Sequence, residues 1–372
     1  NAQIAAGRTG EQRLKSLFDR FGPDTIRAAR DEIFRQTEAK EREEIAALPD
    51  GEYSAEGTID SDGLGNGPIG VKHTVKIEGD GMTVDLAGSA KQAAGPVNCG
   101  LTQTVAAARV AYKLLISSDV SPNGGSFQAL DVIAPKGSIF YAQEPAPCGW
   151  YFTPLGLLID LIVQALSPVL PGKAAGAHYG DSMVITIAGQ DNRHDDEFYL
   201  MIEPTTGGWG AFDGGDGANS LINNVNGSFK DLPIEVFESK YPVRILSYGI
   251  RQDSGGAGKY RGGNGTYREY LIESDSALWL WFERSDTPAW GLFGGESGEP
   301  PNVLIQRPGE ETLERLKAND VKVPKGSVIK SMTGGGGGYG PAAERDPEHV
   351  REDLLDGFIS AEHARNVYGF TG

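Results

Sequence analysis

Cysteine, positive charge and long apolar runs are all scarce in this sequence, and each shortage excludes a class of protein. Only two cysteines occur in 372 residues, so neither a disulfide framework nor a CxxC metal site can be built. The formal net charge of −17 disfavours nucleic acid and anionic membranes as partners, because their phosphates would be repelled. The most apolar run, residues 155–170, is interrupted by Asp160, Gln164 and Pro168 and is too short to span a bilayer. We expect a protein of the reducing cytoplasm.

Recognisable catalytic motifs are missing as well. The glycine-rich residues 207–217 match neither GxxxxGK[ST] nor a GxGxxG that leads into a helix, so a phosphate-binding loop or a dinucleotide fingerprint is excluded. There is no GxSxG, and Cys99 has no recognisable histidine partner. The compact run His194–Asp196 contains metal-ligand residue types, but it lies in a charged stretch between two predicted strands, as a solvated turn would. The sequence therefore predicts no metal site in this chain.

Glycine, in contrast, is abundant: 52 of 372 residues, about twice the usual share. The glycines gather at residues 207–217, 255–265 and 334–340 without a repeating period. Such clusters indicate tight turns and close approach of backbone segments. Gly207, Gly208 and Gly210 could present backbone N–H groups to a substrate. The alternative is that they only form turns at the end of a sheet.

Apolar periodicity predicts helices near both ends of the chain and mostly strands between them. Predicted helices cover residues 9–21, 23–48, 103–116, 155–166, 233–239, 347–356 and 360–368. Predicted strands cover residues 71–77, 82–86, 129–133, 139–141, 183–187, 198–202, 243–248, 266–272 and 277–282. This segregation predicts an α+β fold with glycine-rich, mostly antiparallel mixed sheets and flanking helices. We divide it into a helical hairpin (1–50), an α+β region (51–190), a β-rich glycine-loop region (191–345) and a helical tail (346–372).

Five polar side chains near the glycines are candidates for contact with a small polar ligand: His178, Asp216, Asn224, Lys259 and Arg261. His178, Asp216 and Arg261 are candidates for catalysis, and Asn224 and Lys259 are candidates for binding a substrate. The two cations could stabilise an oxyanion. For each residue the alternative is a purely structural hydrogen bond or ion pair.

The order of the loops is more specific than any one of them. In sequence they are Gly95-Pro96-Val97-Asn98, Thr206-Gly207-Gly208-Trp209-Gly210, Asp216-Gly217, Leu232-Pro233-Ile234-Glu235, Tyr241-Pro242, Asp253–Gly258, Arg261–Gly265, Gly291–Gly295 and Gly334–Gly340. With the tail from Asp346 to Gly369, this series resembles the hydantoinase B/oxoprolinase family from about residue 1 to the end. The family includes the B-type components of ATP-dependent N-methylhydantoinases, 5-oxoprolinases and caprolactamases, and related subunits occur in acetone and acetophenone carboxylases.

The resemblance implies a division of labour between subunits. An A-type partner with an actin-like ATPase fold would bind ATP and Mg²⁺ and activate a lactam, an imide or bicarbonate. The B-type component would handle the activated intermediate with a divalent metal, Zn or Mn, held by His and Asp residues of the family's N-terminal third. No counterpart of those motifs occurs in residues 1–372. The chain is therefore expected to lack that third and to bind no metal by itself.

Three functions remain open at this stage. The chain is expected to be the C-terminal part of a subunit of an ATP-dependent amidohydrolase that opens a hydantoin, 5-oxoproline or a lactam. The first alternative is a subunit of an ATP-dependent ketone carboxylase, and the second is a noncatalytic scaffold subunit. Each implies a hetero-oligomer with an A-type ATPase and an N-terminal B-type segment.

Overall fold

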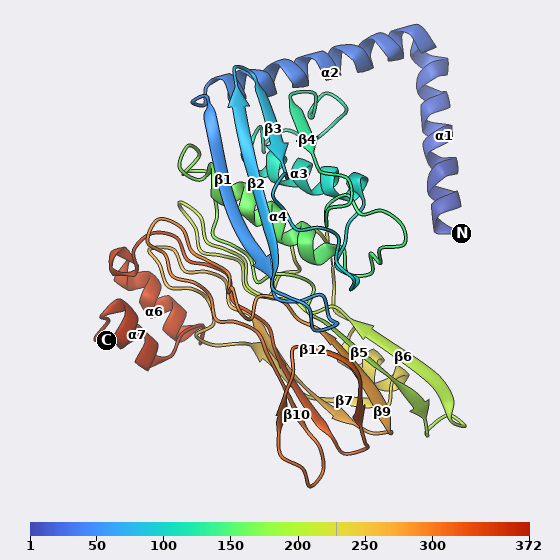
Figure 1. The fold of residues 1–372 in the computed structure, drawn as a ribbon, viewed down its shortest axis with the longest axis vertical. Helices are drawn as coiled ribbons and strands as arrows, with labels where there is room; N and C mark the ends of the chain where they lie inside the picture. The colour runs from blue at the N-terminus through green and yellow to red at the C-terminus, as the bar shows by residue number, and fades with distance from the viewer. Residues whose placement is uncertain (228) are drawn as a thin grey trace.

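The computed structural model describes residues 1–227 and 229–372, and the predicted α+β fold is confirmed. Within these residues the chain forms seven α-helices and three sheets, whose strands are mostly antiparallel. Figure 1 shows the N-terminal sheet and its two helices at the top and the other two sheets below, with long loops running between them. None of the described helices is both long enough and apolar enough to cross a bilayer.

The first two helices were expected to form a hairpin, but they meet at a sharp bend. Helices α1 (Ala2–Phe21) and α2 (Pro23–Ala46) are separated by Gly22, whose φ of +80° interrupts the helical backbone. No residue of α1 is buried, and α2 buries side chains only in its second half. Helix α1 and the first half of α2 therefore stand away from the body of the molecule, and the second half of α2 packs on it (Figure 1).

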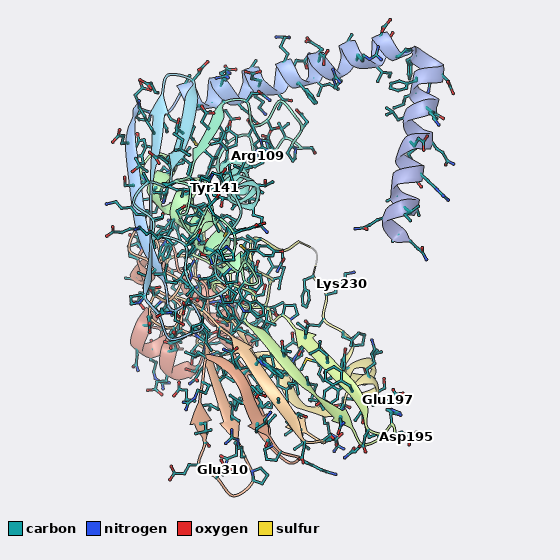
Figure 2. All side chains as sticks on the ribbon, turned by 45° about the vertical axis from the view of Figure 1, so that its right-hand side comes forward. Arg109, Tyr141, Asp195, Glu197, Lys230 and Glu310 are labelled. Atoms are coloured by element: carbon teal, nitrogen blue, oxygen red, sulfur yellow. The ribbon has the colours of Figure 1, made fainter. Side chains whose placement is uncertain are left out.

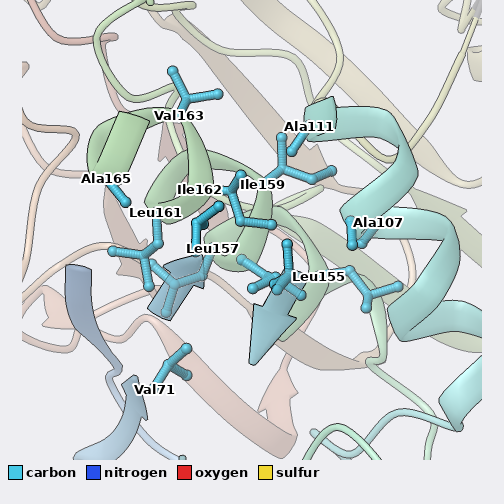
Figure 3. Close-up of a cluster of buried hydrophobic side chains, with 14 of the residues drawn as sticks. Val71, Ala107, Ala111, Leu155, Leu157, Ile159, Leu161, Ile162, Val163 and Ala165 are labelled. Atoms are coloured by element: carbon cyan, nitrogen blue, oxygen red, sulfur yellow. The ribbon is translucent and has the colours of Figure 1, made fainter. Parts of the chain in front are cut away.

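The upper sheet contains β1 (Gly51–Ile59), β2 (Ile69–Glu78), β3 (Gly81–Asp85) and β4 (Leu130–Ile133), in that spatial order. Helices α3 (Leu101–Leu115) and α4 (Phe152–Leu166) form as predicted. Strand β2 alternates buried and exposed residues, so one face is apolar. Figure 3 shows α4 packed between this face and α3, with Leu157 and Leu161 among the buried side chains. The core of the upper part is therefore built around α4.

The strand predicted at residues 139–141 is wrong. Ile139 and Phe140 are fully buried, but they lie in a turn in which the backbone N–H of Ile139 donates to Ala90. A short apolar run can fill a core from a turn, so alternation over three residues is a weak signal for a strand.

Two further sheets make up the lower part. One has the order β11-β10-β13-β8-β7 and the other the order β12-β9-β5-β6. The predicted strands appear as β5 (Val184–Asp191), β6 (Glu197–Glu203), β7 (Val243–Ile250), β8 (Thr266–Ile272) and β9 (Ser276–Trp281). Besides β1 of the upper sheet, four strands of the lower part were not predicted: β10 (Asn302–Gln306), β11 (Leu313–Glu314), β12 (Lys317–Val323) and β13 (Val328–Met332). These four strands are short or polar, so their sequences give little indication of a strand. Hydrogen bonds to the neighbouring strands define them.

Short helices complete the fold. Helix α5 (Ile234–Lys240) precedes β7, and α6 (Pro347–Leu355) and α7 (Ala361–Tyr368) form the predicted C-terminal pair after a 3-10 turn at Ala342–Glu344. Asp346 caps α6 and Ser360 caps α7 by accepting backbone hydrogen bonds. Both helices lie beside the long loops (Figure 1).

The glycine-rich segments pack against one another as a layer between the sheets. We use the name glycine layer for five segments: 174–180, 206–218, 254–265, 289–298 and 334–340. Segment 334–340 donates hydrogen bonds to several of the others: Gly336 to the carbonyl of Gly263 at 2.9 Å and Gly337 to that of Ala177 at 2.9 Å. A Cβ on Gly336 would lie 2.0 Å from the carbonyl oxygen of Trp209, and one on Gly208 would lie 1.8 Å from that of Gly263. Only glycine fits at these positions, because the obstacles are backbone atoms.

A buried charged cluster joins the upper sheet to the lower ones. Glu283 accepts a hydrogen bond from the backbone of Asp60, at the end of β1, and pairs with Lys317 of β12. Asp181 lies nearby and accepts from Thr153 of α4 at 2.8 Å. Burial raises the pKa of Glu283 to about 8 and that of Asp181 to about 6, despite hydrogen bonds and the Lys317 charge that lower them.

The close packing of the glycine layer predicts that one added methyl group lowers the stability of the protein strongly. Gly336→Ala should lower the free energy of unfolding by at least about 3 kcal/mol, because a backbone carbonyl cannot move aside. Gly172→Ala is the matched control: no atom lies within 4 Å of its added methyl, so its effect should stay within about 1 kcal/mol. Urea denaturation measures both, and equal midpoints for the two variants would contradict the packing.

The raised pKa of Glu283 predicts a pH-dependent stability. The fold holds a proton that the unfolded chain releases, so the free energy of unfolding falls as the pH rises from about 4.5 to about 8, by up to about 1.4 kcal/mol per unit. Glu283→Gln stays neutral, so its stability should fall less across this window. Denaturation at several pH values measures the slopes. The exposed Glu56→Gln should keep the wild-type slope, and an unchanged slope in Glu283→Gln would refute the assignment.

Candidate functional site

A second buried polar group is centred on Asp160, a charged residue inside the apolar helix α4. The neighbouring positions of α4 are nearly all buried and apolar, and Asp160 itself is 8% exposed. Its carboxylate accepts from Nη2 of Arg284 at 2.6 Å and from Nδ2 of Asn224 at 3.1 Å. A buried carboxylate needs such partners, since an uncompensated charge in an apolar interior is strongly unfavourable. Arg284 thus balances the charge of Asp160.

His178 completes this group. It lies between α4 and β5, is 2% exposed, and its Nδ1 is 2.7 Å from Oδ2 of Asp160. The backbone N–H of His178 donates to the same oxygen at 3.3 Å. Since a carboxylate only accepts, Nδ1 carries the proton and the lone pair of the neutral ring is on Nε2. The ring is therefore held in one tautomer and one orientation.

Three atoms of the group are buried without any hydrogen-bond partner within the described residues: Nε2 of His178, Oδ1 of Asn224 and Nη1 of Arg284. A cavity of about 60 Å³ adjoins two of these residues, His178 and Asn224. Its other lining residues are Leu114, Ile159, Asp160, Val163, Ala175, Gly176, Trp209 and Gly210. Of these residues, Leu114 is 45% exposed. This volume is sufficient for one or two water molecules or a small polar group.

Aromatic rings and a glycine shape the surroundings of the site. The Trp209 ring lies 6.2 Å from that of His178, and the Arg284 guanidinium lies 4.7 Å from the Trp290 ring. Gly156 on α4 leaves a space: a Cβ there would lie 3.4 Å from Oδ1 of Asn224 and 3.5 Å from Cε1 of His178. The asparagine oxygen and the histidine edge thus border the same space. Each of the two residues thus offers one acceptor atom without a partner among the described residues.

The structure brings together three of the residues predicted from the sequence: His178, Asn224 and Gly210. Asp160 and Arg284 were not predicted as site residues. Asp160 could have been identified from the sequence, because it is the only charged residue in the apolar run of α4. No pattern in the sequence indicates a role for Arg284. It follows β9 in a left-handed conformation with a φ of +67°, and this conformation cannot be recognised from the sequence. A ligand-binding role for any of them stays a prediction.

The backbone N–H groups of Gly207 and Gly208, also predicted to contact substrate, are already used. That of Gly207 donates to Leu221 and that of Gly208 to Gly334, both at 3.0 Å. Both glycines are buried in the glycine layer. In this conformation their N–H groups support the fold.

Asp216 and Arg261 lie elsewhere, beside the C-terminal helices. Arg345 binds Asp216 at 2.7 Å and Asp353 at 2.6 Å, and Arg261 contacts Asp353 at 3.2 Å. Burial raises the pKa of Asp216, but the hydrogen bonds and charge of Arg345 outweigh it and hold the pKa below its usual value. Lys259 is next to this network, with its ammonium 5.6 Å from the Tyr260 ring. These side chains line or flank a cavity of about 470 Å³ that shares no residue with the His178 cavity.

The residues present do not fit a divalent metal. In residues 1–227 and 229–372, no group of three or more His, Cys, Asp or Glu side chains is arranged to hold one. The Asp160 group offers one histidine and one carboxylate, and the Arg284 guanidinium already occupies that carboxylate. The run His194–Asp196 is exposed at the tip of the β5–β6 hairpin, where Figure 2 labels Asp195.

Comparison with known proteins agrees with the resemblance noted in the loops. The model of the family "Hydantoinase B/oxoprolinase" matches residues 1–342. The B-type component of a putative D-/L-hydantoinase from Pseudomonas sp. (strain NS671) is 34% identical over 383 residues, which cover 100% of this chain and 64% of that protein. The beta chain of the caprolactamase from Pseudomonas jessenii is 31% identical over 384 residues, covering 99% of this chain and 65% of the relative. The chain thus spans a little under two thirds of these relatives.

Solved structures give the same result. The ATP-dependent caprolactamase from Pseudomonas jessenii superposes with a TM-score of 0.89 at 28% identity, over 100% of this chain and 66% of that one. A nucleotide-free acetone carboxylase gives a TM-score of 0.82 at 17% identity, over 96% of this chain and 54% of the other, which shows the shared fold. From its loops, its fold and these matches, the chain belongs to the hydantoinase B/oxoprolinase family.

Proposed function

We propose that this chain is part of the B-type component of a cytoplasmic, ATP-dependent complex that opens a cyclic amide or imide. The observation that carries the proposal is the likeness to caprolactamase: 31% identity to its beta chain over 99% of the present chain, and a TM-score of 0.89 with the ATP-dependent enzyme. Hydantoin, 5-oxoproline and lactams are the substrate class that the names of the relatives support. The likeness to acetone carboxylase, at 17% identity, supports only the fold.

The complex divides the reaction between its parts. We assign ATP and Mg²⁺ to an actin-like ATPase partner, which activates the amide oxygen by phosphorylation. A divalent metal, Zn or Mn, belongs to the part of the B-type component outside these residues, since the Asp160 group does not fit one. When bound, the metal supplies Lewis-acid chemistry. This chain contributes the polar cavity of His178 and Asn224, whose free acceptors suit a ligand that donates hydrogen bonds.

A reconstituted complex tests this proposal. The complete B-type component and its ATPase partner are incubated with hydantoin, 5-oxoproline or ε-caprolactam, and both ADP and the new amine are measured. We expect amine to form from at least one substrate, only with ATP, and in proportion to ADP. Ring opening at the same rate without ATP would refute the proposal. Incorporation of labelled bicarbonate into a stable product would identify a carboxylase instead.

A further inference from the structure

We propose that His178 is the general base of the ring-opening reaction and that Asn224 holds the attacking water beside it. The inference rests on the proposed function and adds a catalytic residue in this chain. It starts from two buried acceptors that have no partner among the described residues, Nε2 of His178 and Oδ1 of Asn224, whose side chains belong to residues lining one cavity. Buried acceptors in proteins are nearly always paired, so a bound molecule that donates to these two would satisfy them.

Water has the matching chemistry. One molecule donates two hydrogen bonds, one to each acceptor, and leaves its oxygen lone pairs free for attack. The cavity of about 60 Å³ has room for it. The walls formed by Leu114, Ile159 and Val163 are apolar, so the water has few competing partners there.

Asp160 and Arg284 prepare the base. The Nδ1–H of His178 donates to Asp160 at 2.7 Å, which directs the basic lone pair of Nε2 away from the carboxylate. Asp160 also continues to accept from Nδ1–H when Nε2 takes a proton, and this hydrogen bond stabilises the imidazolium that forms. Arg284, 2.6 Å from the same oxygen, fixes the carboxylate. Asp160 and Arg284 are thus positioning residues.

The proton transfers follow from this geometry. As the water oxygen bonds to the carbon of the phosphorylated amide, its proton moves to Nε2 and the π electrons of the C=N bond move to the ring nitrogen. Nε2 then returns the proton to that nitrogen. The remaining hydroxyl proton also passes to the nitrogen as the C–N bond breaks and the carbonyl forms. The products are a free amine and an acyl phosphate, which a second water hydrolyses to carboxylate and phosphate.

His178→Asn is the decisive variant, because its amide N–H can replace Nδ1–H as the donor to Asp160 while Nε2 is lost. In the reconstituted complex, kcat for amine formation should fall about 10²- to 10⁴-fold with little change in KM. The exposed His349→Asn is the matched control and should keep wild-type activity. A kcat within about threefold of wild type for His178→Asn would overturn the assignment. A wild-type complex inactive on every substrate would instead refute the proposed function.

The tautomer gives a second readout that needs no activity. In the ¹⁵N spectrum of the protein labelled at histidine, the neutral His178 ring should show a protonated Nδ1 and an unprotonated Nε2. The signals that disappear in His178→Asn, or in His178→Gln if the first variant does not fold, assign the ring. A proton on Nε2 of the neutral ring would overturn the assignment, because that nitrogen could not act as a base.

Discussion

The absence of Cβ atoms in the glycine layer is the constraint on which the rest of the structure depends. A Cβ on Gly210 would lie 1.8 Å from the carbonyl oxygen of Gly176, and one on Gly176 would lie 2.6 Å from that of Gly337. Three segments therefore lie in direct backbone contact, with no room for a side chain at these two glycines. This contact brings Gly210 and Gly176 to the same cavity as His178. The layer both supports the fold and sets the walls of the site.

The site forms where the upper and lower parts of the molecule meet. Asp160 belongs to α4, which covers the upper sheet, whereas Arg284 follows β9 of a lower sheet. The ion pair between them is buried, so it depends on both parts being in place. Glu283, the residue before Arg284, pairs with Lys317 and contacts the backbone at the end of β1. Two consecutive residues thus connect the two parts, one at the cavity and one at the charged cluster.

The sequence was sufficient for the elements that carry a strong local signal. The long periodic stretches of α3 and α4 and the alternating strands β8 and β9 could be predicted, and the ordered loops identified the family. The polar strand β12 could not, because its pairing with β9 and not its composition defines it. His178 and Asn224 were candidates by residue type and neighbours alone.

The partners of the candidate residues could not be predicted from local sequence patterns, because they lie far away in the chain. Arg284 is 124 residues from Asp160, and Arg345 is 129 residues from Asp216. Asp216 and Arg261 resemble ligand-binding residues in the sequence. Their carboxylate and guanidinium groups are instead in contact with Arg345 and Asp353, near the end of the chain. Only the folded structure shows that Nε2 of His178 has no hydrogen-bond partner among the described residues, whereas the charges of Asp216 and Arg261 are paired.

The glycine layer also has a consequence for how the chain folds. Segment 334–340 donates to residues 177, 260, 263, 292, 296 and 299, all distant in sequence. Each of these contacts closes a long loop before it is stabilised, and a high contact order of this kind slows folding. The earlier glycine segments gain their last partners only when residues 334–340 arrive. We therefore expect the upper α/β part to become ordered first and the layer to close late, as the rate-limiting step.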